Sequence, residues 1–289
     1  MLKQFGWSPV WADLFEPFRA AGCRPARVVR QEYGAWLCAS GEGEKWLRSA
    51  RRGLQAVTGD WVACSPCWSR IEAVLPRRGV LERKAAGRRL EPQLLAANVD
   101  VALIVMGLDQ DYNLARLERY LLLAESGGVR PVVVLNKRDA CPAASSRLRE
   151  TAASARGARV LLLSALQDDV PLVLSGVAAE AQTAALLGSS GAGKSTITNR
   201  LLGEPVQPTA PVRAAGGRSV HTTTTRWLTP LPCGWLLADL PGLREVMPWH
   251  AQPEAAPPGR FRAELDELAR KRRDRAIRLA SRAIKDKRW

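Results

Sequence analysis

Long apolar runs are missing from this sequence of 289 residues. No run approaches the roughly 18 residues that a membrane-spanning helix needs, and residues 1–9 lack the apolar core of a secretory signal. The six cysteines are scattered along the chain, which is not the clustered spacing of a disulfide framework. These absences predict a cytoplasmic protein with reduced thiols and no membrane partner.

Acidic residues are also in short supply. Asp and Glu number 28 against 43 Lys and Arg, which gives a formal charge of +15 and a pI near 10.3. This surplus favours a polyanionic partner, although a basic surface selected for solubility is the alternative, and charge alone does not separate RNA from DNA or acidic lipid. The 46% hydrophobic and 25% charged residues are ordinary for a globular protein, so neither disorder nor a fibrous architecture is indicated.

Short strand-like segments dominate residues 24–80, which follow an N-terminal extension of residues 1–23. The segments are 26–30, 34–38, 61–64 and 70–75, with glycines between them as breakers. No useful helix-period segment interrupts this stretch, so a small β-barrel is the simplest way to remove the sheet edges. A small open sheet is the alternative.

The pattern changes after a polar and basic stretch, residues 81–97, which we interpret as a linker. Residues 98–248 alternate apolar runs with helix-compatible segments, which is typical of an α/β fold built from βα repeats around a mostly parallel sheet. The apolar runs are 99–106, 131–135, 159–163, 183–187 and 235–238, and the clearest helical segments are 114–124 and 145–155. Residues 249–289 are predicted to form a Pro-rich linker and a short basic helix.

A phosphate-binding loop of the form G-x-x-x-x-G-K-[ST] directly follows the apolar run 183–187. Its glycines let the backbone amides face the phosphates, Lys194 neutralises the β and γ oxygens, and Ser195 offers a hydroxyl to Mg²⁺. The predicted set is Gly188, Ser189, Ser190, Gly191, Ala192, Gly193, Lys194, Ser195 and Thr196. A P-loop that binds a nucleotide with Mg²⁺ is the strongest signal in the chain.

A base-reading motif, N-K-x-D, follows the apolar run 131–135 and comprises Asn136, Lys137, Arg138 and Asp139. The aspartate carboxylate of such a motif accepts hydrogen bonds from N1–H and the exocyclic amine of guanine, a pair that adenine does not present. Asparagine fixes the loop and lysine packs on the base. These residues predict guanine nucleotides, GTP and GDP, as the ligands.

A third element, Ser164-Ala165-Leu166, follows the apolar run 159–163 and resembles the S-A-x element whose backbone amide meets the guanine O6. It is weak alone and gains meaning beside the two stronger motifs. Ser164 and Ala165 are therefore predicted to complete the guanine site.

A fourth motif, D-x-x-G, begins at Asp239 and ends at Gly242. Asp239 is expected to hold Mg²⁺ through water, and the Gly242 amide is expected to sense the γ-phosphate. Residues 217–226 lie between the P-loop and this motif, and their threonines include two candidates for the Mg²⁺ shell, Thr223 and Thr224.

The residue after Gly242 is Leu243 rather than the glutamine that positions the attacking water in many GTPases, so slow intrinsic hydrolysis is predicted. His221 is the candidate catalytic substitute beside Lys194, and a structural or RNA-contacting histidine is the equal alternative.

The order of the motifs is circularly permuted, because N-K-x-D and S-A-L precede the P-loop. The same sheet can still form, since each motif sits on its own strand-loop unit. The cut also places the C-terminal segment directly after D-x-x-G, and we hypothesise that nucleotide state moves it.

This order, with Gly-Arg-Ser-Val-His-Thr-Thr-Thr between the P-loop and D-x-x-G, resembles the ribosome small subunit-dependent GTPase A family. The resemblance covers roughly residues 24–250 and includes Gly59-Asp-Trp-Val62 and Pro241-Gly-Leu-Arg-Glu245. It implies an N-terminal OB-fold, a permuted G domain, and a GTP hydrolase that binds rRNA and is stimulated by the small (30S) ribosomal subunit during its late maturation. Contacts to rRNA phosphates would explain the basic charge.

One departure from the family concerns zinc. The resemblance implies a C-terminal zinc domain of three cysteines and a histidine, but no cysteine follows Cys233, and His250 alone cannot close a tetrahedral site. No zinc site is therefore expected, and the pair Cys64 and Cys67 is interpreted as two buried or half-buried thiols.

Two competing functions stay open from the sequence. A nucleotide-gated RNA-binding adaptor with negligible hydrolysis is the main alternative, and an ATP-dependent P-loop kinase is the third. A monomer is the expected state of assembly.

Overall fold

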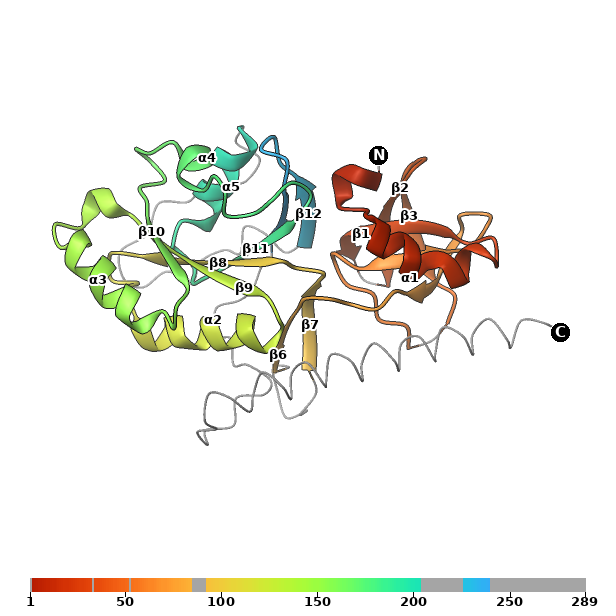
Figure 1. Ribbon diagram of the computed structural model, residues 1–289, viewed down its shortest axis with the longest axis horizontal. Helices are drawn as coiled ribbons and strands as arrows, with labels where there is room; N and C mark the ends of the chain where they lie inside the picture. Colours follow the sequence, from red (N-terminus) through yellow and green to blue (C-terminus); the bar gives the residue numbers. More distant parts are fainter. Residues whose placement is uncertain (1, 33, 52, 85–91, 204–225, 240–289) are drawn as a thin grey trace.

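The computed structural model of the chain describes residues 2–32, 34–51, 53–84, 92–203 and 226–239 (Figure 1). Within these residues eleven strands form one continuous sheet in the order β10-β9-β8-β11-β13-β12-β1-β2-β3-β5-β4. One half of the sheet belongs to an α/β unit and the other half curls into a barrel. The two halves lie side by side along the long axis of the molecule.

The barrel consists of β1 (Arg24–Glu32), β2 (Ala35–Ser40), β3 (Gly43–Ser49), β4 (Trp61–Cys64) and β5 (Arg70–Val74). It closes because β4 pairs with both β5 and β1, and the β3–β5 pair is the one parallel pairing in the ring. This five-stranded closure is that of an OB-fold and confirms the predicted barrel over the open sheet.

The barrel is filled by one set of side chains and covered by another. Its interior is apolar, and includes Val28, Trp36, Cys38, Leu47, Val62, Cys64 and Ile71. Outside, η1 (Leu2–Phe5) and α1 (Pro9–Arg19) belong to the same apolar cluster as buried Trp61. Trp7 meets the Trp61 ring edge-on, with 4.8 Å between centroids. Residues 2–23 therefore contribute four buried side chains to the core, Phe5, Trp11, Phe15 and Phe18.

The α/β unit has five parallel strands, β10 (Arg159–Leu162), β9 (Arg130–Asn136), β8 (Val101–Gly107), β11 (Thr183–Leu187) and β13 (Leu236–Asp239). All seven residues of β8 and all five of β11 are buried, as the continuous apolar runs predicted.

Helices cover both faces of this parallel sheet. The helices α2 (Leu114–Ser126) and α3 (Ala144–Ser154) share one apolar cluster, and α4 (Val170–Val173) and α5 (Lys194–Leu202) share the other. Figure 1 shows the two pairs on opposite sides of the strands. The expected α/β architecture is thus confirmed.

The segment 81–97 differs from the predicted linker. It contains most of a two-stranded antiparallel sheet, β6 (Val80–Lys84) with β7 (Pro92–Ala97), in which Leu81 and Leu95 are fully buried. Its apolar and charged residues do not alternate, so the sequence lacks the period-2 pattern by which a half-buried strand is recognised. The pair packs beside α2 and connects the two halves of the molecule.

The cysteine pair in the barrel agrees only in part with the prediction of two buried or half-buried thiols. Cys64 is buried as expected, but Cys67 is exposed because it sits in the turn between β4 and β5. None of the helices in the described part of the chain is both long and apolar enough to cross a bilayer.

The two halves are joined by β12 (Arg226–Pro230), which runs antiparallel to β13 on one side and to β1 on the other. Arg27 of β1 lies buried at this junction, and its Nη2 donates to Thr183 Oγ1 at 2.8 Å and to the Asn98 carbonyl at 3.2 Å. Its Nε donates to the Gly59 carbonyl at 3.2 Å and its Nη1 to the Phe5 carbonyl. Burial lowers the pKa of this guanidinium to about 10, with Asp100 and Asp60 acting in the opposite direction.

Candidate nucleotide-binding site

Described residues of four motifs lie at one edge of the parallel sheet. The P-loop follows β11, Asn136 ends β9, Ser164 comes just after β10, and Asp239 ends β13. Because parallel strands end at the same edge, residues far apart in sequence converge there, where ligands bind in open α/β sheets. The permuted order of the motifs leaves this convergence intact.

Asn136 links the predicted base site to the predicted phosphate site. Its side-chain Nδ2 donates to the Ala192 carbonyl of the P-loop at 2.9 Å, and its Oδ1 accepts from the Ala165 amide at 2.9 Å. The residue is only 2% exposed, so both hydrogen bonds are shielded from water. One amide side chain thus aligns the P-loop with the S-A-L element.

Asp139 is placed by a short hydrogen bond, since Ser164 Oγ donates to its Oδ1 at 2.6 Å. The Ser164 amide in turn donates to Asp168 Oδ2 at 2.7 Å, and Arg138 Nη2 pairs with Asp168 Oδ1 at 2.6 Å. The Ser164 amide, together with Arg138, holds the pKa of Asp168 below its usual value although slight burial opposes this. Asp168 therefore stays ionised and clamps the two base-reading loops together.

Lys137 is held above the strand ends by a backbone in the left-handed region, with φ 65° and ψ 38°. Its Nζ pairs with Asp109 Oδ2 at 2.6 Å. Partial burial would raise the pKa of Asp109, but the Lys137 ammonium and the Asp111 amide outweigh it and keep the pKa below its ordinary value. The ion pair fixes the Lys137 ammonium beside Asp109.

The P-loop glycines occupy positions that a side chain could not share. A Cβ at Gly188 would lie 2.2 Å from the Val105 carbonyl oxygen, and one at Gly193 would lie 2.1 Å from Asn136 Nδ2. Both residues also have positive φ, 142° and 98°. The loop therefore needs glycine at both ends to lie against β8 and the base-reading asparagine.

Lys194 opens α5, so its side chain lies beside the positive end of that helix. Its Nζ donates to the Gly188 carbonyl at 2.8 Å and to the Ser189 carbonyl at 2.5 Å, which folds the ammonium back over the loop. Ser195 and Thr196 occupy the first turn of the same helix. Helix start, amides and ammonium together make a site suited to a polyphosphate.

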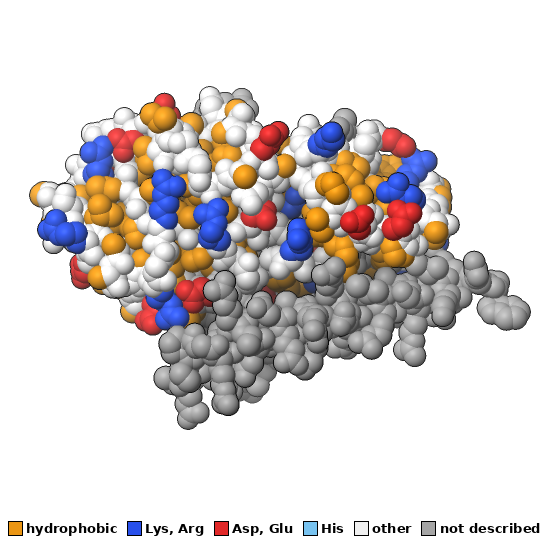
Figure 2. Space-filling view, viewed as in Figure 1, with side chains coloured by type: hydrophobic (Ala, Val, Ile, Leu, Met, Phe, Trp, Pro, Cys, Tyr) orange, Lys and Arg blue, Asp and Glu red, His pale blue; other side chains and the backbone are white. Residues whose placement is uncertain are grey.

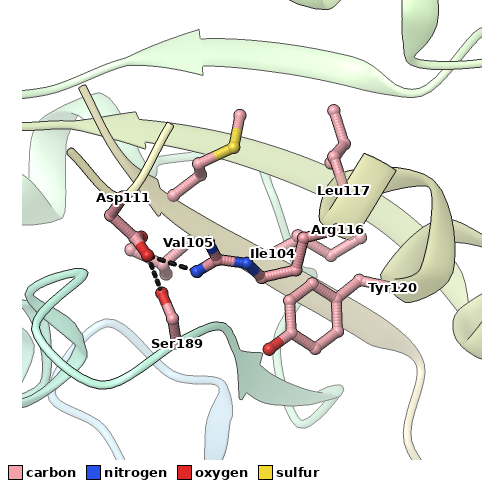
Figure 3. Close-up of a pocket in the computed structure, with 8 residues that line it drawn as sticks. Ile104, Val105, Asp111, Arg116, Leu117, Tyr120 and Ser189 are labelled. Carbon is pink, nitrogen blue, oxygen red and sulfur yellow. Dashed lines mark hydrogen bonds and ion pairs between the residues drawn. The ribbon is translucent and has the colours of Figure 1, made fainter. Parts of the chain in front are cut away.

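A hydrogen-bond network centred on Asp111, beside the P-loop, was not predicted from the sequence. Asp111 Oδ1 accepts from both Ser189 Oγ and Arg116 Nη1, and the dashed lines in Figure 3 mark these contacts. The three residues border a small pocket, whose other lining residues are Ile104, Val105, Met106, Leu117 and Tyr120. Asp111 thereby anchors the second residue of the loop to α2.

The predicted magnesium ligands are described only in part. Asp239 is half-buried at the end of β13, directly beside Leu186 of β11, and Ser195 lies in the helix that follows the P-loop. Hydroxyl and carboxylate oxygens are the donors that Mg²⁺ prefers, so these two residues fit the ion. His221, Thr223, Thr224 and Gly242 lie outside the described residues. Within the described ranges no group of three or more His, Cys, Asp or Glu could hold a metal ion.

Two solved structures share the fold of this chain. The chain is similar to the crystal structure of YjeQ from Thermotoga maritima, with a TM-score of 0.56 and 20% identity over 91% of this chain and 99% of that one. It is also similar to YloQ, described as a circularly permuted GTPase, with a TM-score of 0.52 and 18% identity over 92% of this chain and 97% of that one. The fold is that of a circularly permuted GTPase with an OB-fold barrel.

Sequence relatives then define the family. The family model described as RsgA GTPase matches residues 74–249. A protein from Syntrophotalea carbinolica named small ribosomal subunit biogenesis GTPase RsgA is 43% identical over 266 residues, covering 86% of this chain and 73% of its own. Its namesake from Xylella fastidiosa strain 9a5c is 43% identical over 265 residues, covering 85% and 76%. The chain belongs to the RsgA GTPase family, and it is a GTP hydrolase that binds guanine nucleotides.

Proposed function

We propose that this GTPase acts in late maturation of the small ribosomal subunit, binds its rRNA, and hydrolyses GTP faster when the subunit is present. The relatives' names support the subunit as partner, and the charge of +15 supports contact with RNA phosphates. A cytoplasmic location and a monomeric enzyme are part of the same proposal. The contacts of Asn136 with both neighbouring loops carry the nucleotide-binding part of it.

The chemistry assigned to the site follows from its geometry. Asp139, fixed by Ser164, would accept the two donors on the guanine edge, and a backbone amide of the Ser164-Ala165-Leu166 element would face the guanine O6. Lys194 would leave its two carbonyl partners and bind the β and γ oxygens. Ser195 and Asp239 would hold Mg²⁺, which neutralises phosphate charge when bound. Residues 98–248 would thus form the catalytic domain and residues 24–80 an RNA-binding barrel.

The residues outside the described ranges keep their predicted roles within this proposal. Gly242 would sense the γ-phosphate, Thr223 or Thr224 would complete the Mg²⁺ shell, and His221 would act in place of the missing glutamine. These roles give slow hydrolysis in the free enzyme and leave room for activation by the subunit.

The test is phosphate release from GTP and ATP, with and without purified small subunits, at two salt concentrations. Stimulated, guanine-selective release that weakens with salt is expected. Lys194→Ala should abolish the stimulated rate, whereas Leu172→Ala, an exposed residue of α4, should leave it unchanged.

A subunit that binds without raising the rate would refute the enzymatic role and favour the nucleotide-gated adaptor. Release from ATP at the GTP rate would instead refute guanine recognition by Asp139.

A further inference from the structure

Two exposed tryptophans lie on one face of the sheet where the barrel meets the α/β unit. Among the described tryptophans, Trp46 and Trp227 are the two most exposed, at 41% and 44%. Their counterparts Trp11, Trp36, Trp61 and Trp235 are buried. Single exposed apolar residues are ordinary, but two large indoles on one sheet face are a concentrated apolar surface.

The strand register places both indoles in one row with a basic residue. Trp227 of β12 is directly opposite Arg30 of β1, Arg30 is opposite Leu37 of β2, and Leu37 is opposite Trp46 of β3. Directly opposed residues point to the same side of a sheet, so Trp46, Leu37, Arg30 and Trp227 form a continuous row across four strands. A bulge in β1 between Val28 and Arg30 turns Arg30 to this outer side.

Arg30 stands between the two rings. Its guanidinium carbon lies 4.3 Å from the centroid of Trp227 and 5.6 Å from that of Trp46. Its Nη2 pairs with Glu32 at 2.6 Å, whereas its Nε is buried and has no hydrogen-bond partner in the described structure. The guanidinium is therefore held in place by the aromatic faces but keeps a donor unsatisfied by the protein.

The chemistry of this row selects among possible occupants. Exposed aromatic faces stack on unpaired bases of any sequence, and an arginine beside them binds phosphate or stacks in turn. A duplex presents no free base faces, and an acidic peptide would leave the two indoles uncovered. The chain's large positive charge favours a polyanion, yet Figure 2 shows Lys and Arg spread over both halves of the visible face among acidic side chains. Charge alone would therefore discriminate only weakly between the possible occupants of this row.

We propose that the row Trp46–Arg30–Trp227 is a stacking site for an unpaired, single-stranded segment of RNA. This stacking site specifies where RNA is bound in the proposed function. It rests on the proposed function only for the choice of RNA as the polyanion. The site spans the junction of the two halves, because Trp227 belongs to the α/β unit and the other two residues belong to the barrel. On the α/β side the row continues to Asp239, which is directly opposite Trp227.

The experiment measures binding of fluorescein-labelled oligouridine and of an RNA duplex of matched length to the full chain, at one salt concentration and without ribosomes. Trp46→Ala and Trp227→Ala should each weaken single-strand binding about tenfold, because one stacked base is lost. Trp46→Phe keeps an aromatic face and should restore most of the affinity. Leu172→Ala, which changes another exposed apolar residue, should bind like the unaltered protein.

Quenching of tryptophan fluorescence by oligouridine gives a second readout that a folding defect would not mimic, and circular dichroism checks each variant. Alanine variants that bind the single strand like the unaltered protein would overturn the site. Equal weakening for duplex and single strand, or no binding by the unaltered chain, would do the same.

Failure of this site and failure of the proposed function are separable. Subunit-stimulated phosphate release with no effect of Trp46→Ala on oligouridine refutes the stacking site alone. Tryptophan-dependent oligouridine binding with no stimulation by the subunit refutes the proposed function alone.

Discussion

Replacing Asn136 is the sharpest test of how the nucleotide site is assembled. In Asn136→Ala the Ala192 carbonyl and the Ala165 amide both lose their 2.9 Å partner in a site where the asparagine is 2% exposed. Each buried group left without a partner costs about 1–3 kcal/mol. Because the two loops can relax partly toward water, we take a total near 3 kcal/mol, which corresponds to GDP affinity about 100-fold weaker.

Asn136→Asp makes the same test with almost no change of shape. The carboxylate can still accept from the Ala165 amide, but its second oxygen replaces the donor that faces the Ala192 carbonyl. Two oxygen atoms then oppose each other and a charge is buried, so binding at least as weak as in Asn136→Ala is expected.

The assay is titration with a fluorescent GDP analogue, with urea unfolding to separate local loss from global loss, and Leu172→Ala as control. If Asn136→Ala remained folded and bound GDP within about threefold of the unaltered protein, the linkage of the two loops by this side chain would not determine nucleotide affinity.

Other contacts in the described residues lead to three more predictions. Arg27→Met should lower the free energy of unfolding by about 3–5 kcal/mol in urea denaturation, because it leaves buried acceptors unpaired, whereas exposed Arg48→Met should change it little. Burial raises the pKa of Tyr120 to about 12, so the folded state retains a proton that the unfolded chain loses near pH 10. The contribution of Tyr120 to the free energy of unfolding is therefore complete below pH 10 and is lost as the pH rises to 12. Between these pH values the free energy of unfolding of Tyr120→Phe should fall by up to roughly 2.7 kcal/mol less than that of the unaltered protein. Equal falls in the two proteins would contradict the assignment. Asp139→Asn replaces an acceptor for the guanine edge with a donor. In competition assays GTP should therefore bind at least about 100-fold more weakly, while xanthosine triphosphate should bind more tightly. Unchanged selectivity between the two nucleotides would exclude Asp139 from base recognition.

The α/β unit was predictable because its strands are buried on both faces. β8, β9 and β11 read as unbroken apolar runs, and α2 has a clear helical period, so their positions were predicted within two residues. β3 was missed because it begins at Gly43 and only Leu47 is fully buried in it. An exposed, charged strand carries little signal in its sequence.

The candidate site likewise contains some residues that have a clear signal in the sequence and others that have none. Its motif residues could be singled out as candidates, since glycine, lysine, asparagine and aspartate rarely share these spacings, each directly after a buried strand, in a chain that binds no nucleotide; their roles stay predictions. Asp109, Asp111 and Asp168, which hold Lys137, Ser189 and Ser164, were not predicted. A loop aspartate has no distinguishing neighbours in the sequence, and only the folded chain shows which cation or amide it meets. The helix α1 within the N-terminal extension was likewise not predicted, because prolines at 9 and 17 obscured it, although Pro9 stands at the helix start where proline is tolerated.

The pairing of β12 with β1 determines how the two halves can move. Units joined by a flexible linker rotate freely, but here Arg30 is paired with Trp227 and Gln31 with Arg226 along a shared ladder. A swing of the barrel would have to break this ladder and expose buried Arg27, so no hinge is available at the junction. Any displacement of β12 relative to β13 would therefore carry the whole barrel with it as a lever arm, and a small shift beside Asp239 would become a larger one at the far side of the barrel.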